Sequence, residues 1–301
     1  MDNNHLLTIY MFYLFLTIIC TSALFILFRV YSKLKIDIFQ SIVWNYVVCT
    51  LTGIIHQYDL LNQALYVKHM DTVFAASIVG SCFLPIFFLA GTSTRLAGLT
   101  PTTMASKLSM IIPSACTVII GLAPFTWLQF AAILIGILAV FFSSQTQPST
   151  SETPASNPYL PWLVFITAGL LDLAIMYVNN RIASEESVGL FSIHTFAASA
   201  FWGLIALGIL LLLKKTSFQP KAMLSGIALG IPNYFSVFFL LKTLNYFHHD
   251  GSFVFPALNL SVILLIAIVT LTVFKEKFTP KLIIGIILSI VSIVLLYLNK
   301  V

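Results

Sequence analysis

The chain has 301 residues, of which 59% are hydrophobic and only 8% carry a charged side chain. A soluble globular domain has about 25% charged residues, so this composition excludes a water-exposed surface and requires a largely lipid environment. The formal net charge is +5, but the lysines and arginines stand in short clusters between apolar runs. That pattern is typical of membrane topology signals and argues against a nucleic-acid-binding face.

Ten apolar stretches are long enough to cross the hydrocarbon core as helices, which takes roughly 20 residues for about 30 Å. The first is too long for the apolar region of a signal peptide and lacks a basic segment before it, so we expect it to be retained. We therefore expect an all-α membrane protein. Its ten transmembrane helices are predicted near 6–28, 38–57, 72–93, 101–122, 126–145, 159–180, 188–213, 221–246, 252–274 and 280–298.

The longest polar connection divides the helices five and five. It contains three prolines and no hydrophobic anchor, which predicts a flexible linker at 146–158 between repeats at 1–145 and 159–301. Shifted alignment of the halves supports an internal repeat. A shift of 153 residues lays Gly98 on Gly251, Thr117 on Thr270, Phe125 on Phe278, Thr126 on Thr279 and Ile133 on Ile286, and a shift of 152 lays Arg29 on Arg181 and Phe39 on Phe191.

The charges in equivalent loops indicate that the two repeats are inverted. A repeat of five helices enters the membrane in opposite orientations in its two copies, so equivalent loops should differ in lysine and arginine content. Loops one, seven and nine are rich in lysine and arginine. Their equivalents, in the same order, carry only Arg181, only Lys68 and no basic residue. The rich loops hold Arg29, Lys33 and Lys35; Lys214, Lys215 and Lys221; and Lys275, Lys277 and Lys281. This places those loops in the cytoplasm and both termini outside.

Lys107 is an ionisable residue inside the fourth span, within T-T-M-A-S-K-L-S-M-I-I-P. One interpretation is that it reaches the headgroups from near a helix end. The other is that it lines a cavity, because Ser106 and Ser109 flank it. Pro113 would also free a backbone carbonyl about one turn earlier, and an opened backbone is tolerated in a membrane where it lines a cavity.

Asp172 lies near the middle of the sixth span, too far from either end to reach the headgroups. A carboxyl group at that depth must be protonated, paired or facing water. We expect it to pair with Lys107, which neutralises both charges. Such a pair would either serve transport or form a structural salt bridge.

The eighth span contains the sequence G-I-A-L-G-I-P-N-Y-F-S. Pro232 stands between Gly230 and the hydrogen-bonding side chains of Asn233 and Tyr234. Interruptions of this kind mark substrate sites in transporters, so a broken helix with a binding role is predicted. The alternative is a packing kink with close glycine contacts.

The ninth span has a similar pair, Pro256 and Asn259, in F-P-A-L-N. By the shift of 153 residues, Asn259 corresponds to Ser106, which precedes Lys107. We therefore expect the fourth and ninth helices to face each other across the pseudo-twofold axis, with each offering polar groups to one cavity.

Other polar residues are assigned simpler roles. Asn45, Asn179 and His194 are best explained as interhelical hydrogen-bonding groups. The run His248-His249-Asp250 has the composition of metal ligands, but adjacent residues in a turn rarely converge on one ion, so no metal site is predicted. The cysteines lie one per apolar run without C-x-x-C spacing and are expected to be free; they are Cys20, Cys49, Cys82 and Cys116.

The stretch from Val273 to Leu296 resembles the end of an EamA-like repeat, in which a Glu closes the penultimate helix and a Gly-containing helix follows. Glu276 and Gly285 match, while the first half has Ala123 at the Glu position, so Glu276 is expected to be a loop or capping element. The segments K-L-S-M-I-I-P and G-I-P-N-Y-F-S are also similar to this group. The whole chain thus resembles the drug/metabolite transporter superfamily in its ten-helix form. The resemblance implies a secondary carrier that moves small solutes by alternating access, often with an ion gradient.

The leading hypothesis is a multi-pass transporter in a bacterial plasma (inner) membrane, with a central cavity between helices three, four, eight and nine. Lys107 would hold an anionic or zwitterionic group, and Asp172 would carry a coupled proton. The full set expected to bind the solute is Lys107, Ser106, Asn233, Tyr234 and Asn259, with helix breaks at Pro113, Pro232 and Pro256. The partners expected are the lipid bilayer and a small-molecule solute, without cofactor or nucleic acid.

The alternatives are a lipid flippase, a pure assembly factor and a membrane-embedded enzyme. A lipid flippase would be favoured by an apolar lateral opening. A membrane-embedded enzyme is less favoured, because the apolar runs hold one carboxylate, Asp172, and no H-E-x-x-H metal motif. A Gly-Lys-Thr phosphate-binding loop is also missing, so a primary pump would need a separate ATPase subunit.

Overall fold

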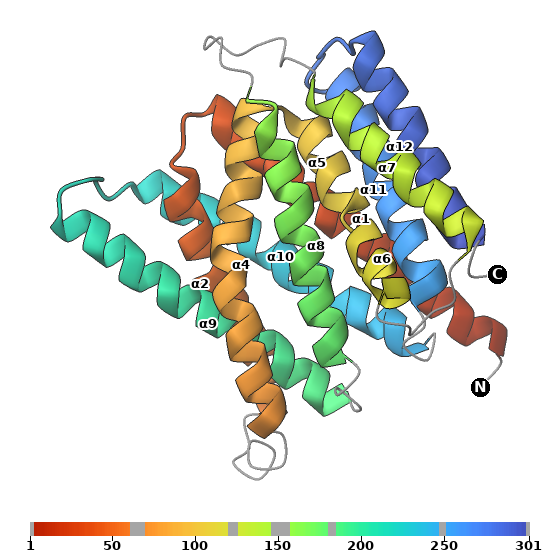
Figure 1. Cartoon of the computed structure of the whole chain (residues 1–301). Coiled ribbons are helices and arrows are strands. Elements are labelled where there is room, and N and C mark those ends of the chain that lie inside the picture. The colour runs from red at the N-terminus through yellow and green to blue at the C-terminus, as the bar shows by residue number, and fades with distance from the viewer. Residues whose placement is uncertain are drawn as a thin grey trace.

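The computed structural model describes residues 3–60, 70–119, 126–145, 157–179, 185–246 and 251–298. Within these ranges every regular element is a helix (Figure 1). The linker expected at 146–158 lies mostly outside the described residues. The elements are α1 (Asn3–Lys33), α2 (Ile38–His56), the 3₁₀ helix η1 (Tyr58–Leu60), α4 (Met70–Leu96), α5 (Leu99–Leu108), α6 (Ile111–Ile119), α7 (Trp127–Ser144), α8 (Tyr159–Asn179), α9 (Glu185–Leu212), α10 (Pro220–Tyr246), α11 (Gly251–Thr272) and α12 (Pro280–Leu298).

Eight helices in the described ranges are long and apolar enough to cross a membrane: α1, α2, α4, α7, α9, α10, α11 and α12. α8 contains a shorter apolar helix, Tyr159–Ile175. The single span expected at 101–122 is instead two short helices, α5 and α6. Large apolar side chains such as Phe74, Trp127 and Leu212 face outward, at 69%, 78% and 84% exposure. The chain is therefore a multi-pass integral membrane protein.

Local side-chain chemistry explains where several helices begin. Asp37 precedes α2 and its carboxylate accepts a hydrogen bond from the backbone N–H of Gln40 at 2.9 Å. Thr126 precedes α7 and its hydroxyl accepts one from the backbone N–H of Gln129 at 3.1 Å. Each cap satisfies one of the backbone donors that a helix leaves free in its first turn.

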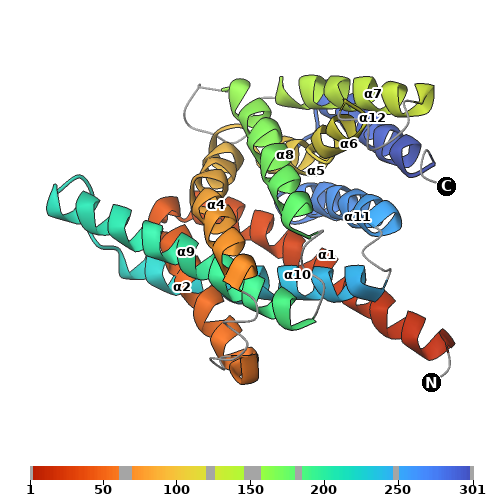
Figure 2. The ribbon, with the colours of Figure 1, turned by 60° about the horizontal axis from the view of Figure 1, so that its bottom comes forward.

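The helices form two groups joined by a central set. Figures 1 and 2 show α2, α9 and α10 together on one side of the molecule and α7 and α12 together on the other, with α4, α5, α8 and α11 between them. The buried apolar side chains divide in the same way into two clusters, and α11 contributes to both. α11 therefore links the two halves of the interior.

Small residues set the closest helix contacts. A Cβ atom added at Gly226 would lie 2.3 Å from the Cβ of Trp44, and one at Gly230 would lie 2.8 Å from the carbonyl oxygen of Asn45. These glycines let α10 approach the backbone of α2, as small residues do at helix interfaces in membranes. Gly80 of α4 does the same against α9, where an added Cβ would lie 2.2 Å from the carbonyl oxygen of Thr195.

We expect Gly80→Ala to destabilise the protein, because its methyl group would overlap the backbone of α9. Overpacking of this kind costs about 1–3 kcal/mol. Gly208→Ala is the matched control, since nothing lies within 4 Å of the position that its Cβ atom would take and alanine is the better helix former by ~1 kcal/mol. Thermal denaturation in detergent should show a lower midpoint for Gly80→Ala and an unchanged or higher one for Gly208→Ala. Equal midpoints would contradict the close α4–α9 contact.

Three helices end in turns that place a lysine in the left-handed backbone region. The residues are Lys35 after α1, Lys214 after α9 and Lys275 after α11, with φ of 55°, 53° and 53°. After α9, the N–H of Lys215 donates to the carbonyl of Leu210 at 2.9 Å, which closes a Schellman-type turn. Glycine usually fills such positions, because a Cβ atom is disfavoured there.

Candidate functional site

The junction between α5 and α6 is a helix break inside the apolar interior. The last helical bond of α5 runs from the N–H of Ser109 to the carbonyl of Ala105 at 3.2 Å, and Ser109 and Met110 then form a turn. Pro113 has no N–H to donate to the Ser109 carbonyl, which instead accepts from Ile112 at 2.9 Å. The break thus lies about one turn before the proline and directly after Lys107.

The carboxylate of Asp172 on α8 is fixed by this junction. Its Oδ2 atom accepts a hydrogen bond from the hydroxyl of Ser109 at 2.9 Å. Asp172 and Lys107 are both half-buried. Among the described residues, however, they form no direct ion pair of the kind expected from the sequence. The structure places Ser109, rather than Lys107, on the carboxylate.

Lys107 and Asn259 complete a polar cluster around the break. The ammonium group of Lys107 lies 5.9 Å from the centre of the Phe25 ring on α1. Asn259, on α11, is buried, and its Nδ2 atom lies 2.9 Å from the thioether sulfur of Met110. The junction cluster is defined as Ser106, Lys107, Ser109, Met110, Asp172 and Asn259. It draws on α5, the turn before α6, α8 and α11.

Asn233 and Tyr234 lie elsewhere, in the interface between α10 and α2. The Nδ2 atom of Asn233 donates to Oδ1 of Asn45 at 3.2 Å. The hydroxyl of Tyr234 lies 3.0 Å from Nδ1 of His56 and accepts from Gln57 at 3.3 Å. Both residues are buried, at 2% and 0% exposure. Their hydrogen-bonding groups are therefore used between helices, and the described structure does not bring them together with the junction cluster.

The predicted helix breaks at Pro232 and Pro256 also differ from the structure. α10 continues through Pro232, and α11 continues through Pro256. Near Pro232 the neighbouring helix α2 bonds to the backbone of α10, since the thiol of Cys49 donates to the carbonyl of Gly230 at 3.2 Å. That bond does not replace the one that Pro232 lacks, whose acceptor would be the carbonyl of Ala228, but α10 stays helical through the proline. The close contacts of Gly226 and Gly230 with α2 agree with the alternative interpretation of this segment, in which it serves helix packing.

The polar residues given simpler roles have mixed outcomes. Asn45 does form an interhelical hydrogen bond, while its Nδ2 atom is buried without a partner in the part of the chain that the structure describes. The side chain of Asn179 and the run His248-His249-Asp250 lie outside the description. No group of three metal-binding side chains occurs among the described residues.

Glu276 forms a buried ion pair with Arg29 at the end of α1. The side chains are 9% and 5% exposed. The N–H of Glu276 donates to the carbonyl of Thr270 at 3.1 Å, directly after the left-handed turn at Lys275. The sequence suggested a loop or capping role for Glu276. The structure adds a contact with α1 that no local pattern indicates, because the partners are 247 residues apart.

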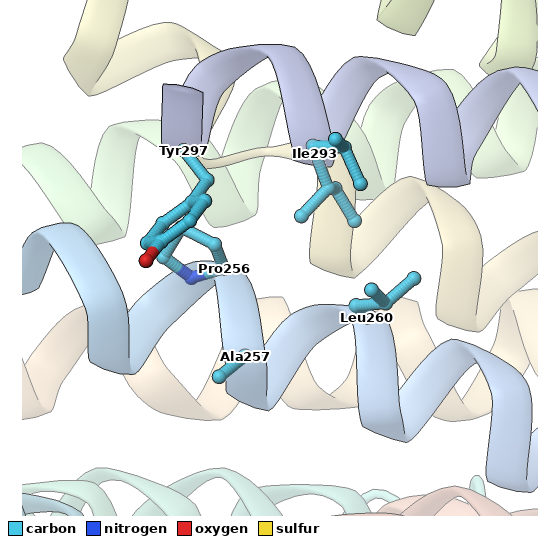
Figure 3. A pocket seen from close by; sticks show the side chains of 6 residues that line it. Pro256, Ala257, Leu260, Ile293 and Tyr297 are labelled. Atoms are coloured by element: carbon cyan, nitrogen blue, oxygen red, sulfur yellow. The ribbon is translucent and has the colours of Figure 1, made fainter. Parts of the chain in front are cut away.

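An apolar groove lies between α11 and α12 (Figure 3). It has a volume of about 140 Å³ and opens to one side. Of the residues predicted to have a transport role, Pro256 is the one that lines it. The groove is formed by Pro256, Ala257, Leu260, Ile293, Val294 and Tyr297.

No family model matches the chain. A protein of Haemophilus influenzae, described as uncharacterized, is similar at 25% identity over 293 residues, which cover 94% of this chain and 97% of the relative. A solved crystal structure of a protein superimposes with a TM-score of 0.56 at 15% identity and covers 96% of both chains. That likeness extends over nearly the whole molecule and concerns the fold alone.

Proposed function

We propose that the protein is a secondary transporter of the bacterial plasma membrane. It moves a small anionic or zwitterionic solute by alternating access, with Asp172 as the carrier of a coupled proton. The observation that carries this proposal is the junction cluster, in which ionisable groups are kept at a helix break within the apolar interior. Ionisable residues at that depth are expensive and mark substrate or proton pathways.

The proposed architecture is ten membrane passes in two inverted repeats, 1–145 and 159–301. Contacts between helices support it, since exchanging the two halves maps packed pairs onto other packed pairs. The α2–α10 pair corresponds to α4–α9, α1–α10 to α4–α8, α1–α11 to α5–α8, and α11–α12 to α5–α7. In this scheme α5 and α6 together make the fourth pass and α8 makes the sixth.

Individual hydrogen bonds follow the same exchange. The thiol of Cys49 donates to the carbonyl of Gly230 at 3.2 Å, and the hydroxyl of Ser199 donates to the carbonyl of Gly80 at 2.7 Å. Positions 49 and 199 differ by 150 residues, as do positions 80 and 230. Equivalent groups in the two halves thus make equivalent bonds.

A second symmetric contact joins α7 and α12. The hydroxyl of Ser292 donates to the carbonyl of Ala132 at 2.7 Å, and a Cβ atom at Gly285 would lie 3.2 Å from the carbonyl oxygen of Ala139. Positions 139 and 292 differ by 153 residues, as do 132 and 285, the same shift that aligned the two halves by sequence. Five passes per copy make the copies antiparallel, the arrangement from which alternating access arises.

The junction cluster is suited to a charged solute. Lys107 is half-buried and has no direct ion pair among the described residues, so its ammonium group is available to a carboxylate or phosphate of the solute. The amide of Asn259 and the hydroxyl of Ser106 lie on the two facing helices. Because α5 belongs to the first half and α8 and α11 to the second, a solute held here contacts both moving bodies.

A lipid flippase is the second candidate, because the groove between α11 and α12 is open and apolar. A membrane-embedded enzyme is not proposed, since the junction cluster holds one carboxylate and neither a second acid nor a histidine base beside it.

The test is solute flux through the full-length protein in liposomes. A thermal-shift screen over amino acids, sugars, nucleosides and cationic drugs identifies solutes that bind, and their uptake is then measured with and without an imposed pH gradient. We expect saturable uptake that the gradient accelerates. Absence of saturable uptake for every binding solute, together with movement of fluorescent lipids between leaflets, would replace the transporter by the flippase.

A further inference from the structure

Ser109 has one hydroxyl hydrogen and two acceptors. Its oxygen lies 2.9 Å from Oδ2 of Asp172 and 2.7 Å from the backbone carbonyl oxygen of Ser106. A serine hydroxyl donates once and accepts through its lone pairs, so it cannot donate to both groups at the same time. Which group receives the hydrogen depends on whether the carboxyl group of Asp172 is itself able to donate.

The carbonyl of Ser106 matters to the helix break. α5 ends at Leu108, so this carbonyl belongs to the last turn, where helix carbonyls lack backbone partners. The hydroxyl of Ser109 is the side chain that satisfies it. Loss of that bond leaves a partly buried acceptor unpaired and weakens the connection between α5 and the turn that leads into α6.

We propose that Ser109 is the positioning residue that couples the protonation of Asp172 to the α5–α6 break. When Asp172 is charged, its carboxylate accepts the Ser109 hydrogen, and the Ser106 carbonyl loses its partner. When Asp172 takes up a proton from water, its own O–H donates to the Ser109 oxygen. The Ser109 hydrogen then turns to the Ser106 carbonyl and fixes the end of α5. The Ser109 hydroxyl only rotates between its two acceptors, and its O–H bond is never broken.

Few groups that can carry a charge lie on the helices packed against Asp172. α8 packs against α4, α5, α6 and α7. α7 has no titratable side chain, and α6 contributes the thiol of Cys116. α5 carries Lys107, and a positive charge nearby favours the carboxylate form. α4 has charges at its two ends and one thiol between them: Asp71, Arg95 and Cys82.

This coupling would link solute binding to proton uptake. An anionic group of the solute that neutralises Lys107 removes a charge that favours the carboxylate, so Asp172 is protonated more readily and α5 is fixed. The inference rests on the proposed function in taking Asp172 as the proton carrier, but the switch itself needs no solute.

The experiment is hydrogen–deuterium exchange of the full-length protein in lipid nanodiscs, at one acidic and one alkaline pH that bracket the titration of Asp172. The exchange rate of peptides covering 105–119 is divided by that of α12 in the same sample. This ratio removes the pH dependence of the chemical exchange rate that all backbone amides share. We expect the wild-type junction to be about fivefold better protected at acidic pH, the ratio expected for one hydrogen bond of ordinary net strength.

Matched variants separate the switch from a structural role. Ser109→Ala should lose the pH-dependent ratio, and Ser109→Thr should restore it because the hydroxyl is retained. Asp172→Asn should show the same protection at both pH values, because its amide does not titrate. A pH-independent wild-type junction, or the same ratio in Ser109→Ala as in wild type, would overturn the proposal. If Ser109→Ala does not fold, Ser109→Thr and Asp172→Asn decide the question. The exchange result does not depend on finding solute flux. Solute flux can likewise be found even if exchange at the junction does not change with pH.

Discussion

Lys107→Ala is expected to reduce solute uptake by about 10- to 100-fold, because a hydrogen bond to a charged group contributes about 1.5–3 kcal/mol. If the lysine binds the solute in both the ground and transition states, the loss will appear mainly as a higher KM. Initial rates of uptake into proteoliposomes measure both constants. Lys215→Ala is the control, since Lys215 is exposed in the loop after α9. Equal loss in both variants would show that net charge, and not the junction cluster, determines uptake.

Asp172→Asn tests the proposed role of Asp172 as the carrier of a coupled proton. Asparagine keeps the shape and a hydrogen-bonding group but cannot carry a proton, so we expect uptake to become independent of an imposed pH gradient while exchange of solute across the membrane continues. Acceleration by the gradient that persists in Asp172→Asn would remove the coupling role from this residue.

The second large effect is expected at the ion pair between Arg29 and Glu276. Glu276→Gln leaves the guanidinium group of Arg29 buried without its counter-charge, which costs about 3–5 kcal/mol. The thermal denaturation midpoint in detergent should fall markedly. Lys277→Gln is the control, because Lys277 is exposed one residue away.

A double variant separates two quantities: the net contribution of the ion pair to stability, and the destabilisation caused by leaving one buried charge alone. Replacing both partners by apolar residues, as in Arg29→Met with Glu276→Leu, removes both buried charges together. Such replacements are often neutral or stabilising, so this variant should be more stable than Glu276→Gln. A double variant less stable than the single one would mean that the pair itself stabilises the contact between α1 and the segment before α12.

The membrane-spanning helices could be predicted from the sequence because each is a local property. Long apolar runs determine them, and most helix bounds agree with the expected spans to within a few residues, as in α12 (Pro280–Leu298). Pro113 also acts locally, through the N–H group that it lacks, and the observed break lies one turn before it. Both features depend on residues that are close together in the chain.

Partner choice could not be predicted in the same way. Asn233 pairs with Asn45 across 188 residues, and Arg29 pairs with Glu276 across 247. The effect of Pro232 was also unpredictable from the local sequence. Whether a proline interrupts a membrane helix depends on how that helix packs against its neighbours. For the candidate site, the sequence indicated Lys107, Asp172 and Asn259 but offered no reason to place Ser109 on the carboxylate.

The left-handed lysines have a consequence for how the protein enters the bilayer. Lys35, Lys214 and Lys275 all belong to the three loops that are rich in basic residues, a charge pattern that acts on the direction of insertion. Each also adopts a backbone conformation that is about 1–2 kcal/mol less favourable for a residue with a Cβ atom. Glycine would relieve that strain but would delete the charge. A glycine substitution at any of these three positions would therefore change helix termination and loop charge together.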